Sequence, residues 1–170
     1  DSSGYVMEEA LHRALSYSPK FSPLTIDGVA KVLVAGAVGG FPGLNPKTDY
    51  ANVEMLIYVG TNPMVSHAHN TGMFNPAVWI KAAARRGEVW TIDPLFTETA
   101  KLSTRHIAAY PGKDYAILAW LVREIIDGGP LDAQQPVHGL DELRAALQGL
   151  DRATAADIAG VPGQDLEDLL

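Results

Sequence analysis

The chain has 170 residues, of which 47% are hydrophobic and 19% charged, and it contains no cysteine. This is the composition of a globular protein that is long enough to bury a core. The missing thiols exclude a disulfide scaffold, a thiolate zinc site, a cysteine-ligated iron–sulfur cluster and a cysteine nucleophile within these residues. Thirteen Lys and Arg against twenty Asp and Glu give a net charge of −7, and the scattered basic residues argue against nucleic acid as a partner.

Neither end of the sequence shows a targeting or membrane signal. No apolar run reaches the roughly 20 residues of a membrane helix, so we expect no transmembrane segment. The start, Asp1–Gly4, lacks an initiator Met and the basic and apolar regions of a signal peptide, and the sequence stops inside a predicted helix. We therefore interpret the chain as a piece of a longer polypeptide. The compartment stays open, with the cytoplasm favoured.

Residues 1–50 are predicted to hold a helix, a loop and a second apolar segment that leads into the main domain. Val6–Leu15 has apolar residues at helical spacing, and the polar, proline-bearing residues 16–23 end that helix. Lys31–Gly40 fits either a strand that enters a glycine-rich phosphate loop or a buried helix that stops at its glycines. Its glycine spacing matches neither the dinucleotide nor the P-loop fingerprint, which disfavours the phosphate loop.

Residues 51–130 show the pattern of a parallel sheet. Met55–Gly60 is a continuous apolar run of strand length, which predicts a strand buried on both faces. A helix over Pro76–Arg86 and a strand over Val89–Ile92 complete a β–α–β unit. A third strand over Ile107–Tyr110 and an apolar helix over Asp114–Asp127 follow. We therefore predict the α/β class, with a Rossmann-like parallel sheet and flanking helices.

Residues 131–170 are predicted to form a helical tail. Apolar residues at helical spacing predict short helices over Leu140–Leu147, Thr154–Ala159 and Gln164–Leu170. The glycines and proline of residues 160–163 separate the last two helices.

Polar residues follow all three predicted strands, at the sheet edge where ligands of open parallel sheets bind. Gly60–Pro63 combines a glycine that permits close approach with short polar groups that suit a phosphate. Asp93 follows the second strand, where dinucleotide-binding folds hold ribose hydroxyls. Asp114 follows a Pro-Gly turn, and its carboxylate can accept the paired N–H groups of guanine. Together these residues predict a nucleotide site.

Simpler interpretations of the same residues stay open. Asn62-Pro63 and Asp93-Pro94 also fit ordinary turns, and Asp114 fits a helix N-cap.

Two other kinds of site are weaker candidates. His67 and His69 have the alternate spacing of metal ligands on a strand, but they lie in a predicted loop without a third ligand nearby. The sequence contains the three residue types of a hydrolytic triad, in Ser66, His106 and Asp93. It lacks the G-x-S-x-G motif that would place the serine as a nucleophile.

The strand-end residues also carry a resemblance to a known family. From about Thr25 to its end, the sequence resembles the molybdopterin oxidoreductases that carry a bis-(molybdopterin guanine dinucleotide) molybdenum or tungsten centre, such as formate dehydrogenases and nitrate reductases. The resemblance is carried by ordered motifs, which are Met55–Pro63, Val65–His67, Ile92–Pro94 with Thr97–Ala100, His106, Pro111–Asp114, and Thr154–Leu166 in the tail.

The resemblance implies that this segment is the α/β domain that binds one of the two pterin guanine dinucleotides. It also implies that Lys31–Gly40 is helical, and we adopt that prediction. The implied cofactor-binding residues are Val59, Gly60, Thr61, Asn62, Pro63, Ser66 and His67 at the phosphates and guanosine, Ile92, Asp93, Pro94 and Phe96 around the ribose, and Gly112 and Asp114 at the guanine.

The resemblance also implies a metal ligand and further partners. The family's metal ligand comes from a loop before the helix, which corresponds here to Thr25–Gly28, so Asp27 is the candidate catalytic and metal-ligating residue. The implied partners are the rest of the parent polypeptide, which can hold an iron–sulfur cluster, and electron-transfer subunits. The 170 residues alone are not expected to turn over substrate.

Three functional hypotheses follow. The leading one is a fragment of a molybdenum- or tungsten-dependent oxidoreductase that binds the guanosine diphosphate arm of one molybdopterin guanine dinucleotide, the intact enzyme catalysing two-electron redox or oxygen-atom transfer. The second is a non-catalytic nucleotide-binding or assembly module that keeps the fold without the metal. The third is an NAD-type dinucleotide-binding domain.

Overall fold

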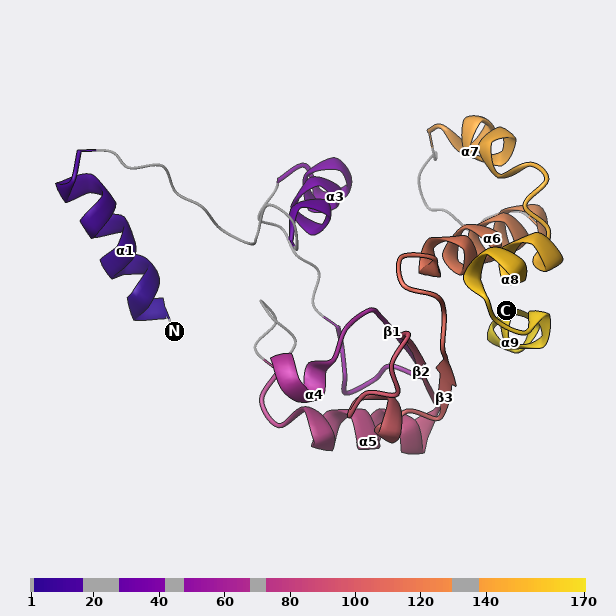
Figure 1. Cartoon of the computed structure of the whole chain (residues 1–170), viewed down its shortest axis with the longest axis horizontal. Helices are drawn as coiled ribbons and strands as arrows, with labels where there is room; N and C mark the ends of the chain where they lie inside the picture. Colours follow the sequence, from indigo (N-terminus) through magenta and orange to yellow (C-terminus); the bar gives the residue numbers. More distant parts are fainter. Residues whose placement is uncertain (1, 17–27, 42–47, 68–72, 130–137) are drawn as a thin grey trace. The chain divides into compact units, whose positions relative to one another are not determined.

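The computed structural model describes residues 2–16, 28–41, 48–67, 73–129 and 138–170 (Figure 1). The chain divides into two units, residues 1–47 and residues 48–170. The first unit contains the helices α1 (Ser2–Ala14) and α3 (Val29–Gly39), and the second contains the sheet and the remaining helices.

Helix α3 resolves the ambiguity of its glycine-rich sequence. The segment is helical, as the family resemblance implied, and not a strand that enters a phosphate loop. Gly40 ends the helix in the left-handed conformation with a φ of 72°, which a residue without Cβ adopts readily.

The second unit is built on a three-stranded parallel sheet. The strands β1 (Met55–Val59), β2 (Glu88–Ile92) and β3 (Arg105–Ile107) lie in the order β1-β2-β3. Between β1 and β2 run the short helix α4 (Pro63–Ser66) and the crossover helix α5 (Pro76–Arg86). The predicted α/β class and the parallel sheet are confirmed.

Strand β1 departs from its prediction, because it is not buried on both faces. Leu56 and Tyr58 are buried, whereas 45% of Met55 and 37% of Ile57 are exposed. The alternation follows from the position of β1 at the edge of the sheet. The strand buried on both faces is the central β2, in which Val89–Ile92 are all buried.

The third strand is shorter and earlier than predicted. It covers Arg105–Ile107 instead of Ile107–Tyr110, because the chain leaves the sheet after Ile107 and the backbone N–H of Tyr110 donates to the carbonyl of Ala159 at 2.8 Å. A hydrogen bond to a helix end thus replaces the expected strand pairing.

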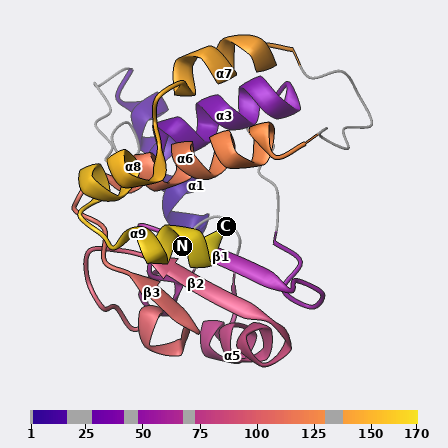
Figure 2. The ribbon, with the colours of Figure 1, turned by 90° about the vertical axis from the view of Figure 1, so that its right-hand side faces the viewer.

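Helices cover both faces of the sheet (Figure 2). On one face, Ile80 and Ala83 of α5 pack with Leu56, Tyr58 and Val89. The other face lies under α6 (Asp114–Asp127), α8 (Arg152–Ala159) and α9 (Gly163–Leu169), while α7 (Leu140–Leu147) lies beside α6. Helices α5, α6 and α7 have the predicted bounds, and none of the described helices is long and apolar enough to cross a membrane.

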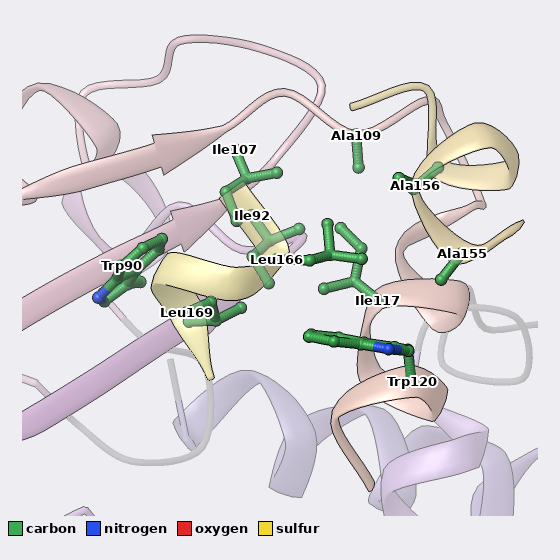
Figure 3. Close-up of a cluster of buried hydrophobic side chains, with 11 residues drawn as sticks. Trp90, Ile92, Ile107, Ala109, Ile117, Trp120, Ala155, Ala156, Leu166 and Leu169 are labelled. Atoms are coloured by element: carbon green, nitrogen blue, oxygen red, sulfur yellow. The ribbon is translucent and has the colours of Figure 1, made fainter. Parts of the chain in front are cut away.

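The larger apolar cluster joins the sheet to the tail helices (Figure 3). Leu166 and Leu169 of α9 lie between Ile92 of the sheet and Ile117 and Trp120 of α6. Leu166, Ile92 and Ile117 are at most 1% exposed. This packing of α9 and α6 fixes β3 and the turn that follows it.

Candidate functional site

The three strands end in register at one edge of the sheet. Val59, Ile92 and Ile107 are aligned partners in neighbouring strands. Two hydrogen bonds continue the pairing beyond the last strand residues, from Gly60 N to Ile92 O at 2.9 Å and from Asp93 N to Ile107 O at 3.0 Å. The structure therefore brings the first two predicted strand-end sequences side by side.

The loop after β1 turns sharply at Gly60. The glycine has a φ of +56°, and among the described residues a Cβ placed on it would meet no atom within 4 Å, so they leave the space above it open. Pro63 is buried at the start of α4, where its missing N–H loses no hydrogen bond. Ser66 Oγ donates to the Asn62 carbonyl at 3.1 Å, and His67 closes α4 in the left-handed conformation.

The half-buried side chain of Asn62 is engaged by other residues of the protein. Its Nδ2 donates to Glu98 Oε2 at 2.8 Å, and its Oδ1 accepts hydrogen bonds from Thr99 Oγ1 at 2.7 Å and Thr99 N at 3.3 Å. The bond from the Asn62 amide lowers the pKa of the Glu98 carboxyl below its ordinary value. Glu98 and Thr99 belong to the Thr97–Ala100 motif, but the sequence does not reveal that they bind a loop more than thirty residues earlier in the chain.

The loop after β2 is organised around Asp93. Its Oδ1 accepts a hydrogen bond from Leu95 N at 2.9 Å, which forms the turn expected at Asp93-Pro94. The ring of His106 bonds through Nε2 to the Asp93 carbonyl at 2.8 Å and packs edge-on against Phe96 at 5.2 Å between ring centroids. Ile92 is 1% exposed, so only its backbone can face a ligand.

The turn after β3 presents Asp114 at the beginning of α6. Gly112 has a φ of +71° with open space above it, and Lys113 N donates to the Tyr110 carbonyl at 2.9 Å. Lys113 is the N-cap residue and Asp114 is the first residue of the helix, so the N-cap interpretation of Asp114 is wrong. Among the described residues, no hydrogen bond or ion pair engages the half-buried Asp114 carboxylate, which leaves it free to accept hydrogen bonds from a ligand.

The weaker candidates do not assemble in the structure. The Ser66 hydroxyl and the His106 ring each bond to a backbone carbonyl and not to one another, so no hydrolytic triad forms. Within the described ranges, no group of three or more His, Asp or Glu side chains could hold a metal ion. His69 and Asp27 lie outside those ranges, so the histidine pair and the candidate metal ligand stay predictions.

Several features of these loops are of the kind that nucleotide ligands use. Gly60 and Gly112 leave open space where any side chain would project. In the described part of the chain, the backbone N–H groups of Thr61 and Asn62 have no hydrogen-bond partner, and such groups are suited to phosphate oxygens. The carboxylates of Asp93 and Asp114 add acceptors for hydroxyl and N–H groups.

The fold and the alignment of the strand ends define an α/β domain with a parallel sheet. Comparisons with known proteins indicate the family to which this domain is related. No family model matches the chain. The assimilatory nitrate reductase of Haloferax mediterranei is 31% identical over 124 residues, which cover 71% of this chain and 16% of that protein. The F420-dependent formate dehydrogenase 2 subunit alpha of Methanococcus maripaludis is 24% identical over 145 residues, which cover 84% of this chain and 20% of that protein.

A solved structure shows the same fold. Acetylene hydratase from Pelobacter acetylenicus superimposes with a TM-score of 0.58 at 20% identity, over 71% of this chain and 16% of that one. The chain therefore spans 16 to 20% of the length of these relatives. The resemblance carried by the strand-end motifs is confirmed: the chain is related, as a segment, to the molybdopterin oxidoreductases.

Proposed function

We propose that the carboxyl edge of the sheet binds the guanosine diphosphate arm of one molybdopterin guanine dinucleotide, as part of a molybdenum- or tungsten-dependent oxidoreductase. The observation that carries the proposal is the common edge on which the Gly60 and Asp93 loops emerge in register, in a chain related to nitrate reductases and a formate dehydrogenase. The intact enzyme transfers two electrons, and in some reactions an oxygen atom, at the metal that the pterin holds.

Each strand end has a part in this proposal. The Thr61 and Asn62 N–H groups donate to the diphosphate, and Gly60 keeps the backbone open to its approach. Asp93 has one carboxylate oxygen in its turn and offers the other to the ribose hydroxyls. Asp114 accepts the two parallel N–H groups on one edge of guanine, a pattern that adenine lacks.

The remaining predicted contacts follow the same loops. Phe96 is exposed beside the His106 ring and offers an apolar surface next to the ribose, while Val59, Ile92 and Pro94 contribute backbone groups where the first two strands end. Pro63, Ser66 and His67 shape the first loop from α4. Asp27 remains the proposed oxygen ligand of the metal.

Calorimetric titration of the 170-residue chain with GDP and with ADP tests the guanine assignment. We expect GDP to bind more tightly than ADP, and Asp114→Asn to remove that preference, because an amide cannot accept two parallel N–H bonds. Lys113→Ala, at the neighbouring exposed position, is the matched control and should keep the preference. Equal binding of the two nucleotides by the unmodified chain would contradict the guanine assignment.

Two further measurements separate the other hypotheses. Quenching of NADH fluorescence by the chain, with no response to GDP, would favour an NAD-type domain. Metal analysis of the parent polypeptide distinguishes the enzyme, which holds molybdenum or tungsten, from a metal-free nucleotide-binding module.

A further inference from the structure

Thr99 is the centre of a buried hydrogen-bond network behind the first two loops. Its side chain is fully buried, and its Oγ1 donates to Asn62 Oδ1 at 2.7 Å while accepting from Met64 N at 3.2 Å. The Thr99 carbonyl accepts from Ser103 Oγ at 3.0 Å, and that hydroxyl is 2.7 Å from Thr91 Oγ1 in the central strand. One continuous chain of bonds therefore joins the loop after β1 to the body of β2.

The network clamps the loop after β1 on both sides of its ligand-facing groups. At Gly60 the backbone N–H is held by the bond to Ile92 O, and at Met64 it is held by the bond to Thr99 Oγ1, while the side chain of Asn62 is held by Thr99 through its Oδ1. Thr61, between the two anchors, makes no backbone hydrogen bond of its own within the described residues. A donor group fixed in place before a ligand arrives loses little entropy on binding.

Thr99 is also the point at which the two loops are joined. It lies in the segment that leaves β2 through Asp93, whereas its hydrogen bonds reach the loop that leaves β1. Replacing Thr99 with Val keeps the volume but leaves Met64 N without its acceptor and Asn62 Oδ1 with the Thr99 N–H alone. A buried polar group that loses its partner favours a local rearrangement. In Thr99→Val, the loop that carries Thr61 has lost these bonds, and we expect this loop to rearrange.

We propose that Thr99 is a positioning residue for nucleotide binding, which acts through Asn62 and Met64 to hold the Thr61 and Asn62 N–H groups at a fixed spacing from Asp93. The proposal rests on the proposed function of this edge. In this proposal Asn62 has two roles: its side chain belongs to the hydrogen-bond network, and its backbone N–H faces the ligand.

The test compares GDP affinity across threonine variants of the 170-residue chain, at a temperature where circular dichroism shows each variant folded. Thr99→Val should raise the GDP Kd by about tenfold, and Thr99→Ser, which restores the hydroxyl, should stay within about twofold of the unmodified chain. The control is Thr104→Val, which removes a hydroxyl at an exposed position. The Thr104 hydroxyl also makes two backbone hydrogen bonds, to Val89 N and Val89 O, but it lies next to the first residues of β2 and β3, away from the carboxyl edge.

The outcomes separate the two proposals. If the unmodified chain does not bind GDP, the proposed function fails and this inference fails with it. If the unmodified chain binds GDP and Thr99→Val binds it equally well, only the inference is overturned. Equal losses in Thr99→Val and Thr104→Val would reflect general destabilisation and would also overturn it.

A second variant covers the case in which Thr99→Val does not fold. Ser103→Ala removes the donor to the Thr99 carbonyl and leaves both Thr99 side-chain bonds in place. We expect a rise in the GDP Kd of about two- to threefold. An unchanged Kd in folded Ser103→Ala would then contradict the role of the network.

Discussion

Two regions of the sheet edge are held by different kinds of interaction. The loops after β1 and β2 are joined by directional hydrogen bonds among Asn62, Glu98, Thr99 and Ser103. The turn after β3 is held by apolar packing, in which α6, α8 and α9 bury Ile107, Ile117 and Leu166. Apolar burial is large and non-directional, whereas hydrogen bonds contribute little net stability but fix geometry. We therefore expect one set of residues, the apolar ones, to determine the free energy of unfolding, and another set, the polar ones, to determine the positions of the loops.

Leu166→Ala should produce the largest loss of stability. The side chain is fully buried between the sheet and α6, and truncations of this kind cost about 2–5 kcal/mol. Urea denaturation measures the loss. Leu170→Ala, at a 55% exposed position just beyond α9, is the control. Equal losses for the two variants would contradict the central place of Leu166 in the cluster.

Gly160→Ala should produce the next largest loss. The residue has a φ of +69°, which costs an L-residue about 1–2 kcal/mol, and its new Cβ would collide with the ring of Tyr110. Gly149→Ala shares the left-handed backbone, with a φ of +85°, but has open space above it. The difference between the two melting temperatures therefore measures the contact with Tyr110, and a difference of zero would show that the ring moves away freely.

Thr91→Val, which removes a hydroxyl of the hydrogen-bonded region, should cause a smaller loss of stability. The buried Thr91 hydroxyl bonds to Ser103 Oγ, and removing one such bond costs about 1 kcal/mol. Denaturant unfolding of Thr91→Val and of Thr91→Ser, which keeps the hydroxyl, separates the hydrogen bond from the lost methyl group. A larger loss in Thr91→Val than in Leu166→Ala would overturn the division between apolar stability and polar geometry.

Glu98→Gln should have the smallest effect at neutral pH, because the amide oxygen of Gln still accepts a bond from Asn62 Nδ2. The variant should, however, change the pH dependence of stability. The folded pKa of Glu98 lies below its ordinary value, so its contribution is present above the ordinary pKa of the unfolded chain and is lost as the pH falls through the lowered folded pKa.

Unfolding curves between about pH 6 and pH 3 measure this contribution. The unmodified chain should lose more stability over that range than Glu98→Gln does. Parallel curves for the two proteins would show that the Asn62–Glu98 bond does not couple to folding.

The elements with strong local signals were predictable from the sequence. Pro76 begins α5 and Gly87 follows its last residue, and these two signals sufficed to place the helix. The bounds of β1 and β2 came within a residue from their apolar runs. The register of Val59 with Ile92, and hence the shared edge, follows from the β–α–β connection.

The features that the sequence did not predict depend on contacts between residues far apart in the chain. The edge position of β1 depends on which strand lies beside it, and an apolar run does not reveal that. Strand β3 ends early because Tyr110 bonds to Ala159, a residue 49 positions later in the chain. The sequence alone does not show that the Asn62 side chain is engaged within the protein, because its partner Thr99 lies 37 residues away and comes close only on folding.

The late position of α9 in the chain has a consequence for synthesis on the ribosome. The sheet face that carries Trp90 and Ile92 is covered by Leu166 and Leu169, which emerge long after β2 and β3 have been made. Until then, the part of that face that Leu166 and Leu169 cover is exposed to solvent, even though α6 and α8 are already made, and an exposed apolar surface of this kind promotes aggregation of a nascent chain or binding of a chaperone. Ribosome-stalled chains that end before and after α9 should therefore differ in how strongly they bind a chaperone that recognises exposed apolar surface.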